Sequence, residues 1–214
     1  RFTNPLTGQV VIIPWDWLIF LVTLFWILGM INTVNFLDGL DGLAGGVGTI
    51  AALVFAWHSY RLGQTAVAAF PLALAGALLG FLIFNFAPAK IFLGTAGAFV
   101  LGYQLATLAI ISPAKIATAL LVMAVPIMDV AWQIVTRIRR GQNPLHGDRG
   151  HLHFRLSDGG LPVRRIVLGY YAVSLMFGLV AIFAPSPLIK LVMLLGLGTA
   201  VFLTLIWLSR RNTP

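Results

Sequence analysis

Long apolar stretches alternate with short polar joints along most of the chain. The stretches approach the roughly 20 helical residues that cross the hydrocarbon core of a bilayer. The joints contain proline, glycine or charge, as in "RLGQ", "NFAPAK" and "SPAK". Because backbone polar groups inside a bilayer must bond within their own segment, we expect these stretches to be helical. The pattern predicts an all-α polytopic transmembrane bundle of about seven spans, over approximately 17–34, 44–60, 66–86, 97–112, 116–136, 166–184 and 188–208.

The charged residues predict which helix ends share a side of the membrane. Lys and Arg collect on the cytoplasmic side of membrane proteins, and with seven spans most of the 14 Lys and Arg residues lie at one set of ends. The exceptions are Arg1, Arg61, Lys115 and Lys190. The asymmetry places the 32–46 stretch, the 85–97 joint and a polar loop at about 137–165 on the cytoplasmic face. On the other face, "TNPLTG" followed by "QVVII" predicts a short hairpin.

Composition excludes most other classes of protein. With 59% hydrophobic residues, 9% charged residues and a mean hydropathy of +0.96, the chain does not suit a water-soluble globule. The net charge of +8 is expected to serve topology and anionic lipid headgroups, and no nucleic-acid-binding motif is visible. There is no cysteine, which excludes disulfides and thiolate metal sites, and no glutamate. We interpret residues 1–214 as one membrane domain, the C-terminal part of a longer chain.

The end of the first span carries the first group of candidate functional residues. Asn32, Asn35, Asp38 and Asp41 are spaced three apart, so neighbouring members are adjacent on a helix, and Asn35 and Asp38 form the natural pair. Gly39 and Gly42 predict that the helix ends just after Asp38. Carboxylate and amide oxygens at a membrane edge suit Mg²⁺ together with phosphate oxygens. For Asp41, an N-cap of the following helix is an equally open interpretation.

The loop "NPLHGDRGHLHFRL" carries the second group. His151 and His153 lie close in sequence to Asp148, Arg149 and Arg155. Arginine matches the geometry of phosphate oxygens, and histidine can hold or move a proton near neutral pH. The alternative is a solvated interfacial loop with incidental histidines. The spacing of the two histidines does not suit a closed zinc site.

Asp129 is a third candidate, because it lies inside the predicted fifth span, well before the basic residues that end it. Carboxylates at such depth are costly and usually face a polar cavity or a partner. A simple pairing with Gln133, one turn further on, is the alternative.

Together these segments resemble a known family. Asn32 to Leu43 matches an N-x-x-N-x-x-D-G-x-D-G-L block, and Pro126 to Asp129 with Asp148 to His153 matches a P-x-x-D segment leading to a D-R-x-H-x-H loop. Both are similar to motifs of the polyprenyl-phosphate N-acetylhexosamine-1-phosphate transferase superfamily, the membrane enzymes of glycosyltransferase family 4. The resemblance covers essentially the whole chain. It is closer to the branch that makes lipid-linked N-acetylglucosamine than to the peptidoglycan translocase.

The resemblance implies a reaction and a location. A sugar 1-phosphate, with N-acetylglucosamine 1-phosphate expected, passes from a UDP-sugar to a polyprenyl phosphate such as undecaprenyl phosphate, and UMP is released. The cofactor is Mg²⁺, or Mn²⁺ in its place. The site faces the cytoplasm at the bacterial cytoplasmic membrane, and a homodimer is left open.

By position, the resemblance also assigns roles to residues. The catalytic assignments are Asp38, Asp41, His151 and His153, with Asp38 also the metal or diphosphate carboxylate. The substrate-binding assignments are Asn32, Asn35, Asp129, Asp148, Arg149 and Arg155.

Three departures from the family pattern bear on function. Thr95 stands where a G-D-x-G-S block has its metal-binding aspartate, Phe154 replaces a third histidine, and the preceding helices with an adjacent pair of aspartates are missing. These departures keep open a catalytically lapsed homologue that binds lipid phosphate or nucleotide-sugar. An ion-coupled transporter using Asp38 and Asp129 is a further alternative, but it leaves the histidine and arginine loop unexplained.

Overall fold

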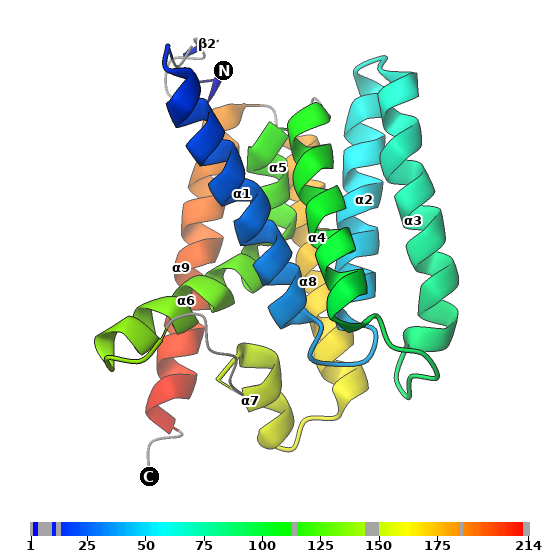
Figure 1. Ribbon diagram of the computed structural model, residues 1–214. Coiled ribbons are helices and arrows are strands. Elements are labelled where there is room, and N and C mark those ends of the chain that lie inside the picture. Colours follow the sequence, from blue (N-terminus) through cyan, green and yellow to red (C-terminus); the bar gives the residue numbers. More distant parts are fainter. Residues whose placement is uncertain are drawn as a thin grey trace.

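The computed structural model describes residues 2–3, 10–11, 14–112, 115–143, 150–184 and 186–211. It is an α-helical bundle (Figure 1), which confirms the predicted fold class. The helices are α1 (Asp16–Leu37), α2 (Leu43–Arg61), α3 (Thr65–Asn85), α4 (Gly94–Ile111), α5 (Lys115–Val122), α6 (Ala124–Arg139), α7 (Leu152–Asp158), α8 (Val163–Phe183) and α9 (Pro187–Arg211). Strands β1 (Phe2–Thr3) and β2 (Val10–Val11) pair antiparallel at the start of the chain, as the predicted hairpin requires.

Most of the predicted spans can be identified among the described helices. Within the described residues, α1, α2, α3, α4 and α8 are long and apolar enough to cross a membrane, which makes this a multi-pass membrane protein. The predicted fifth span is broken: α5 and α6 meet at Met123 at an angle of 82°. Counting that pair as one span gives six among the described residues. The seventh predicted span falls on α9, a helix of 25 residues whose described apolar part is Leu188–Ala200, and it stays a prediction.

The break has a local cause. Pro126 has no backbone N–H, and its ring would clash with the carbonyl of Val122 four residues earlier in a continuous helix. The chain therefore leaves the helical path at Met123 and begins again at Ala124. As a result α6 runs across the lower part of the bundle instead of along it (Figure 1).

Helix α2 is the most buried of the five spanning helices, and small residues allow helices to approach one another. In the membrane-spanning part of α2, 72% of the residues are buried inside the bundle, against 17% in that of α1. A Cβ atom added at Gly48 would lie 3.1 Å from Leu101 of α4, and one added at Gly102 would lie 2.6 Å from the backbone of Ile31 in α1. Such contacts are the usual basis of helix packing in membranes. Gly48 of α2 and Gly102 of α4 therefore form packing surfaces.

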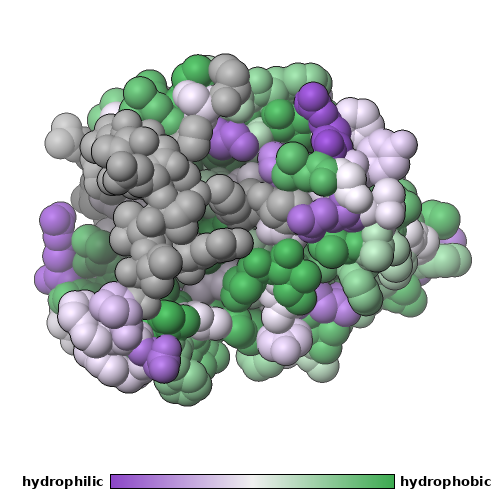
Figure 2. All heavy atoms as spheres, turned by 90° about the horizontal axis from the view of Figure 1, so that it is seen from above, coloured by the Kyte–Doolittle hydropathy of each residue, from purple (hydrophilic) through white to green (hydrophobic). Residues whose placement is uncertain are grey.

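The arrangement brings distant segments to one end of the bundle. Figure 1 shows the turn between α1 and α2, the connection between α3 and α4, and helix α7 together at its lower end. The sequence prediction grouped these segments in the same way. Viewed from the opposite end, the described residues show large hydrophobic areas with scattered hydrophilic ones (Figure 2). Exposed side chains of α1 such as Trp17, Phe20 and Phe25 are in keeping with contact with lipid.

Candidate functional site

The turn between α1 and α2 begins where the sequence predicts. Helix α1 ends at Leu37, and the amide of Asp38 makes the last helical hydrogen bond, to the carbonyl of Val34 at 3.0 Å. Gly42 then adopts a φ of +81°, which favours glycine, and α2 starts at Leu43. Asp38 and Asp41 thus lie on a non-helical turn, where side chains and backbone groups can face a ligand together.

Asp38 lies next to the start of α4. Burial raises the pKa of its carboxyl to about 6; a hydrogen bond from the backbone of Gly94 lowers this pKa, and the nearby charge of Asp41 raises it. Thr95, in the first turn of α4, is exposed. The structure therefore brings the position expected for a family carboxylate beside Asp38, although that position holds a neutral hydroxyl.

Asp41 connects the turn to the loop between α3 and α4. Its Oδ2 accepts a hydrogen bond from the backbone amide of Ala89 at 2.9 Å. The N-cap of α2 is Gly42, without a side-chain capping bond, so interpreting Asp41 as an N-cap is wrong. Of the two asparagines on α1, Asn32 donates to the carbonyl of Leu28 in its own helix at 2.8 Å, and Asn35 is half-buried one turn before Asp38.

Asp129 holds the segment that leads into α7. Its Oδ2 lies 2.9 Å from His151 Nδ1, and its Oδ1 accepts from the backbone amide of Leu152 at 3.0 Å. Both Asp129 and His151 are buried. Gln133 does not pair with Asp129; its side chain donates to the carbonyl of Gly150. Because α6 bends away, Asp129 does not lie deep in a straight span but faces the segment that carries the histidines.

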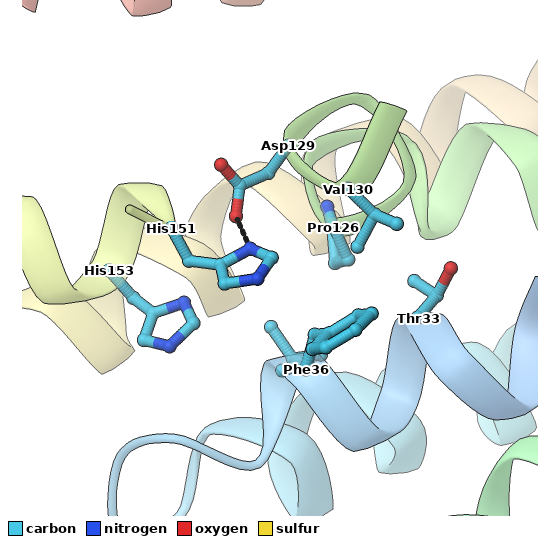
Figure 3. A pocket seen from close by; sticks show the side chains of 8 residues that line it. Thr33, Phe36, Pro126, Asp129, Val130, His151 and His153 are labelled. Carbon is cyan, nitrogen blue, oxygen red and sulfur yellow. Dashed lines mark hydrogen bonds and ion pairs between the residues drawn. The ribbon is translucent and has the colours of Figure 1, made fainter. Parts of the chain in front are cut away.

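The geometry around His151 assigns its tautomer. A carboxylate can only accept, so Nδ1 must carry the hydrogen that the Asp129 bond uses. In the neutral ring Nε2 is then an acceptor, and it is buried without a hydrogen-bond partner among the described residues. Figure 3 shows Asp129 on one side of the His151 ring and Phe36 of α1 on the other, with ring centroids 5.0 Å apart for Phe36 and His151.

His153 connects the histidine segment with the turn that carries Asp38 and Asp41. Its ring is 1% exposed and lies beside His151, with centroids 5.8 Å apart. A Cβ atom added at Gly39 would lie 2.4 Å from His153 Nε2 and 2.6 Å from the ring of Phe154. Burial lowers the pKa of His153 to about 4, although the charge of Asp129 raises it. His153 is thus buried against the turn and His151 against Phe36 of α1, so the two histidines do not lie in a solvated loop.

The remaining candidates are placed less fully. Arg155 lies on α7, half-buried; burial lowers the pKa of its guanidinium and the charge of Asp129 raises it. Asp148 and Arg149 lie outside the described residues. Within the described part of the chain, no three histidine or aspartate side chains are grouped closely enough to hold a metal ion by themselves.

Three residues that the sequence analysis missed hold the turn and loop in place. Asn85 Oδ1 accepts from the Gly42 amide at 3.0 Å, and its Nδ2 donates to the carbonyl of Ile91 at 2.9 Å. The other two are on α8: Tyr171 OH donates to the Gly42 carbonyl at 2.5 Å, and Arg164 Nε to the Ala87 carbonyl at 2.8 Å. Asn85 had a detectable signal, because it is an amide directly after a long apolar stretch.

Comparison with known proteins identifies the family. The family model for glycosyl transferase family 4 matches residues 1–113, which include the turn and Thr95. The chain belongs to this family. It is 33% identical over 196 residues to a probable undecaprenyl-phosphate N-acetylglucosaminyl 1-phosphate transferase of Bacillus subtilis, covering 89% of this chain and 55% of that protein. The predicted resemblance is therefore confirmed.

Other relatives belong to two types. A decaprenyl-phosphate N-acetylglucosaminephosphotransferase of Mycolicibacterium smegmatis is 37% identical over 164 residues, 65% of this chain and 39% of that protein. A phospho-N-acetylmuramoyl-pentapeptide-transferase of Moorella thermoacetica is 34% identical over 134 residues, 62% of this chain and 42% of that protein. The chain thus spans about half the length, or less, of these relatives. Because the alignment to the Bacillus subtilis protein covers 89% of this chain, it must include both the turn and the histidine segment.

Proposed function

We propose that the protein to which this chain belongs transfers N-acetylglucosamine 1-phosphate from UDP-N-acetylglucosamine to a polyprenyl phosphate, with release of UMP. The donor, the lipid, and the cytoplasmic face of the bacterial inner membrane are all part of the proposal. One observation carries it: Asp38 and Asp41 on one side, and His151 with Asp129 on the other, meet at the same end of the bundle through the contact of Gly39 with His153. The names of the relatives support the same reaction class.

The chemistry of the site suits a diphosphate. In the transfer, an oxygen of the lipid phosphate forms a bond to the phosphorus attached to the sugar, and the bond from that phosphorus to the bridging oxygen of UMP breaks. Such reactions depend on positioning and on stabilising negative charge. Arg155 offers a positive charge near Asp129. His151 Nε2, held as an acceptor by Asp129, can take a hydrogen bond or a proton from a phosphate oxygen.

A metal ion fits the turn in part. Burial and the neighbouring Asp41 both disfavour an isolated negative charge on Asp38, so a bound cation would be stabilised there. Mg²⁺ needs only one or two carboxylates when water and phosphate oxygens complete its shell. Asp38 would hold it, with the Thr95 hydroxyl as a neutral neighbour in place of a second charge. When bound, Mg²⁺ would neutralise charge on the diphosphate.

The test uses the full-length protein in detergent or liposomes, with UMP release from UDP-N-acetylglucosamine and undecaprenyl phosphate, with and without Mg²⁺. Asp38→Asn keeps the shape of the side chain and removes its charge, so we expect a loss of turnover of at least about 100-fold with an unchanged melting temperature. Asp16→Asn, at the exposed opposite end of the same helix, is the matched control and should retain full activity. Undiminished turnover in Asp38→Asn would contradict the assignment.

Thr95 favours a second candidate, a lapsed homologue that binds its ligands without turnover. It predicts that the wild-type protein binds UDP-N-acetylglucosamine, measured by calorimetry or thermal shift, and releases no UMP at any Mg²⁺ concentration. Release of UMP by the wild type excludes it.

A further inference from the structure

The backbone of Gly42 is held from two sides by elements far away in the sequence. Its amide donates to Asn85 Oδ1 at 3.0 Å, and its carbonyl accepts from Tyr171 OH at 2.5 Å. The same carbonyl also accepts the first helical bond of α2, from the Gly46 amide at 3.0 Å. The hydrogen bond from Gly46 orients the Gly42 carbonyl along the axis of α2. The hydrogen bond from Tyr171 holds the same carbonyl against α8.

The sequence of α2 makes room for this contact. An added Cβ atom at Gly46 would lie 1.9 Å from both Cζ and OH of Tyr171, so only glycine at this position allows the phenol ring to reach the turn. Gly46 lies one turn after Gly42. The ring therefore fills a space that α2 leaves open, with its hydroxyl directed at the peptide that precedes the helix.

A second contact of α8 holds the loop opposite the turn. Arg164 lies seven residues before Tyr171, which is about two turns and places both on one face of α8. Its Nε donates to the Ala87 carbonyl at 2.8 Å. Two residues further along that loop, the Ala89 amide donates to Asp41 Oδ2. Helix α8 thus contacts both segments that surround Asp38 and Asp41.

The same helix follows directly on the histidine segment. Only residues 159–162 separate the end of α7 from the start of α8. Any shift of α8 relative to α2 would therefore change the spacing between the aspartate turn and His151. We propose that Tyr171 is a positioning residue, which sets the turn carrying Asp38 and Asp41 in register with the histidines of α7. This inference rests on the proposed transfer reaction and adds a residue to it.

The test compares kcat and KM of full-length Tyr171→Phe with those of the wild type, in the same UMP assay. Phenylalanine keeps the ring over Gly46 and removes only the hydroxyl. Because small misplacements of reacting groups lower turnover strongly, we expect kcat to fall at least about tenfold, with KM for the UDP-sugar changed less than about twofold. Tyr103→Phe, on the exposed surface of α4, is the matched control and should match the wild type.

A purely structural role gives a different result. It would lower the melting temperature and the yield of folded protein, and leave kcat per folded molecule unchanged, which would overturn the proposal. Hydrogen exchange of the peptide covering residues 38–46 provides a measurement that does not depend on turnover. We expect faster exchange there in Tyr171→Phe than in Tyr103→Phe, and equal exchange overturns the contact. A wild-type protein that releases no UMP overturns the transferase function instead, and exchange then decides the contact alone.

Discussion

Asp129→Asn separates the two tasks of this carboxylate, because asparagine keeps its shape and halves its capacity to accept hydrogen bonds. In the wild type, one oxygen accepts from His151 Nδ1 at 2.9 Å and the other from the Leu152 amide at 3.0 Å. Asparagine offers one oxygen and one NH₂ group. The Leu152 amide is a fixed donor, so the oxygen must face it. The NH₂ group then faces His151 Nδ1, which can accept only if the hydrogen moves to Nε2.

The substitution therefore reverses the role of His151 in the site. Nε2, an acceptor in the wild type, becomes a donor and can no longer serve as the proton acceptor that the proposed function assigns to it. Replacing bonds to a charged acceptor by neutral ones costs about 1–2 kcal/mol of the free energy of unfolding. Loss of a positioned proton acceptor typically costs about 10²–10⁴ in rate. We expect activity to fall by at least about 100-fold while the melting temperature decreases only slightly.

The assay is the initial rate of UMP release by the full-length protein, together with thermal unfolding in detergent. The control is Asp158→Asn at the exposed end of α7, the helix that Asp129 contacts. It makes the same change of charge and should leave the rate unchanged. If Asp129→Asn retains a rate within about threefold of the wild type while remaining folded, His151 does not act as a proton acceptor, and the pair is structural.

Two further predictions concern the contact between α7 and the turn. Burial lowers the pKa of His153 to about 4 while an unfolded histidine titrates near 6.5, so protonation favours the unfolded chain. The melting temperature in detergent should therefore decrease as pH falls from about 6.5 to about 4. His153→Leu should reduce that decrease, and an identical pH profile in the variant would contradict the burial of a neutral ring. Gly39→Ala places a Cβ atom 2.4 Å from His153 Nε2, so we expect a loss of about 1–3 kcal/mol of stability and impaired turnover. The control is Gly76→Ala on α3, where an added Cβ atom meets nothing within 4 Å. Equal stability of these two glycine variants would mean that α7 does not pack on the turn.

Local patterns were enough to predict the helices and the turn that carries Asp38. Apolar stretches of membrane-spanning length can satisfy their backbone groups only as helices, so the first four spans and α8 follow from composition and length. Gly39 and Gly42 predicted the end of α1, because their backbone freedom favours leaving the helix there. The family motifs indicated which polar residues to consider for the site, since they preserve the order and spacing of residue types.

The broken fifth span shows where that reasoning stops. Pro126 was visible in the sequence, yet the apolar residues around it indicated one continuous helix. Proline is tolerated in the first turn of a helix, so its presence alone does not show whether a helix begins there or a longer span is broken there. Pro126 favours a break, but the packing of α6 against its neighbours decides that the chain turns through 82° and presents Asp129 to His151.

The contacts that build the site lie beyond any local pattern. Asp129 meets His151 across 22 residues, and Tyr171 meets Gly42 across 129. Spacing along one helix determines which side chains share its face, but not which face of another helix they meet. The sequence alone therefore determined the membrane helices, the family and the identity of the polar residues, because these depend on composition and short-range order. The tertiary structure decided their pairing, because close approach depends on glycines and bends that act only when helices pack together.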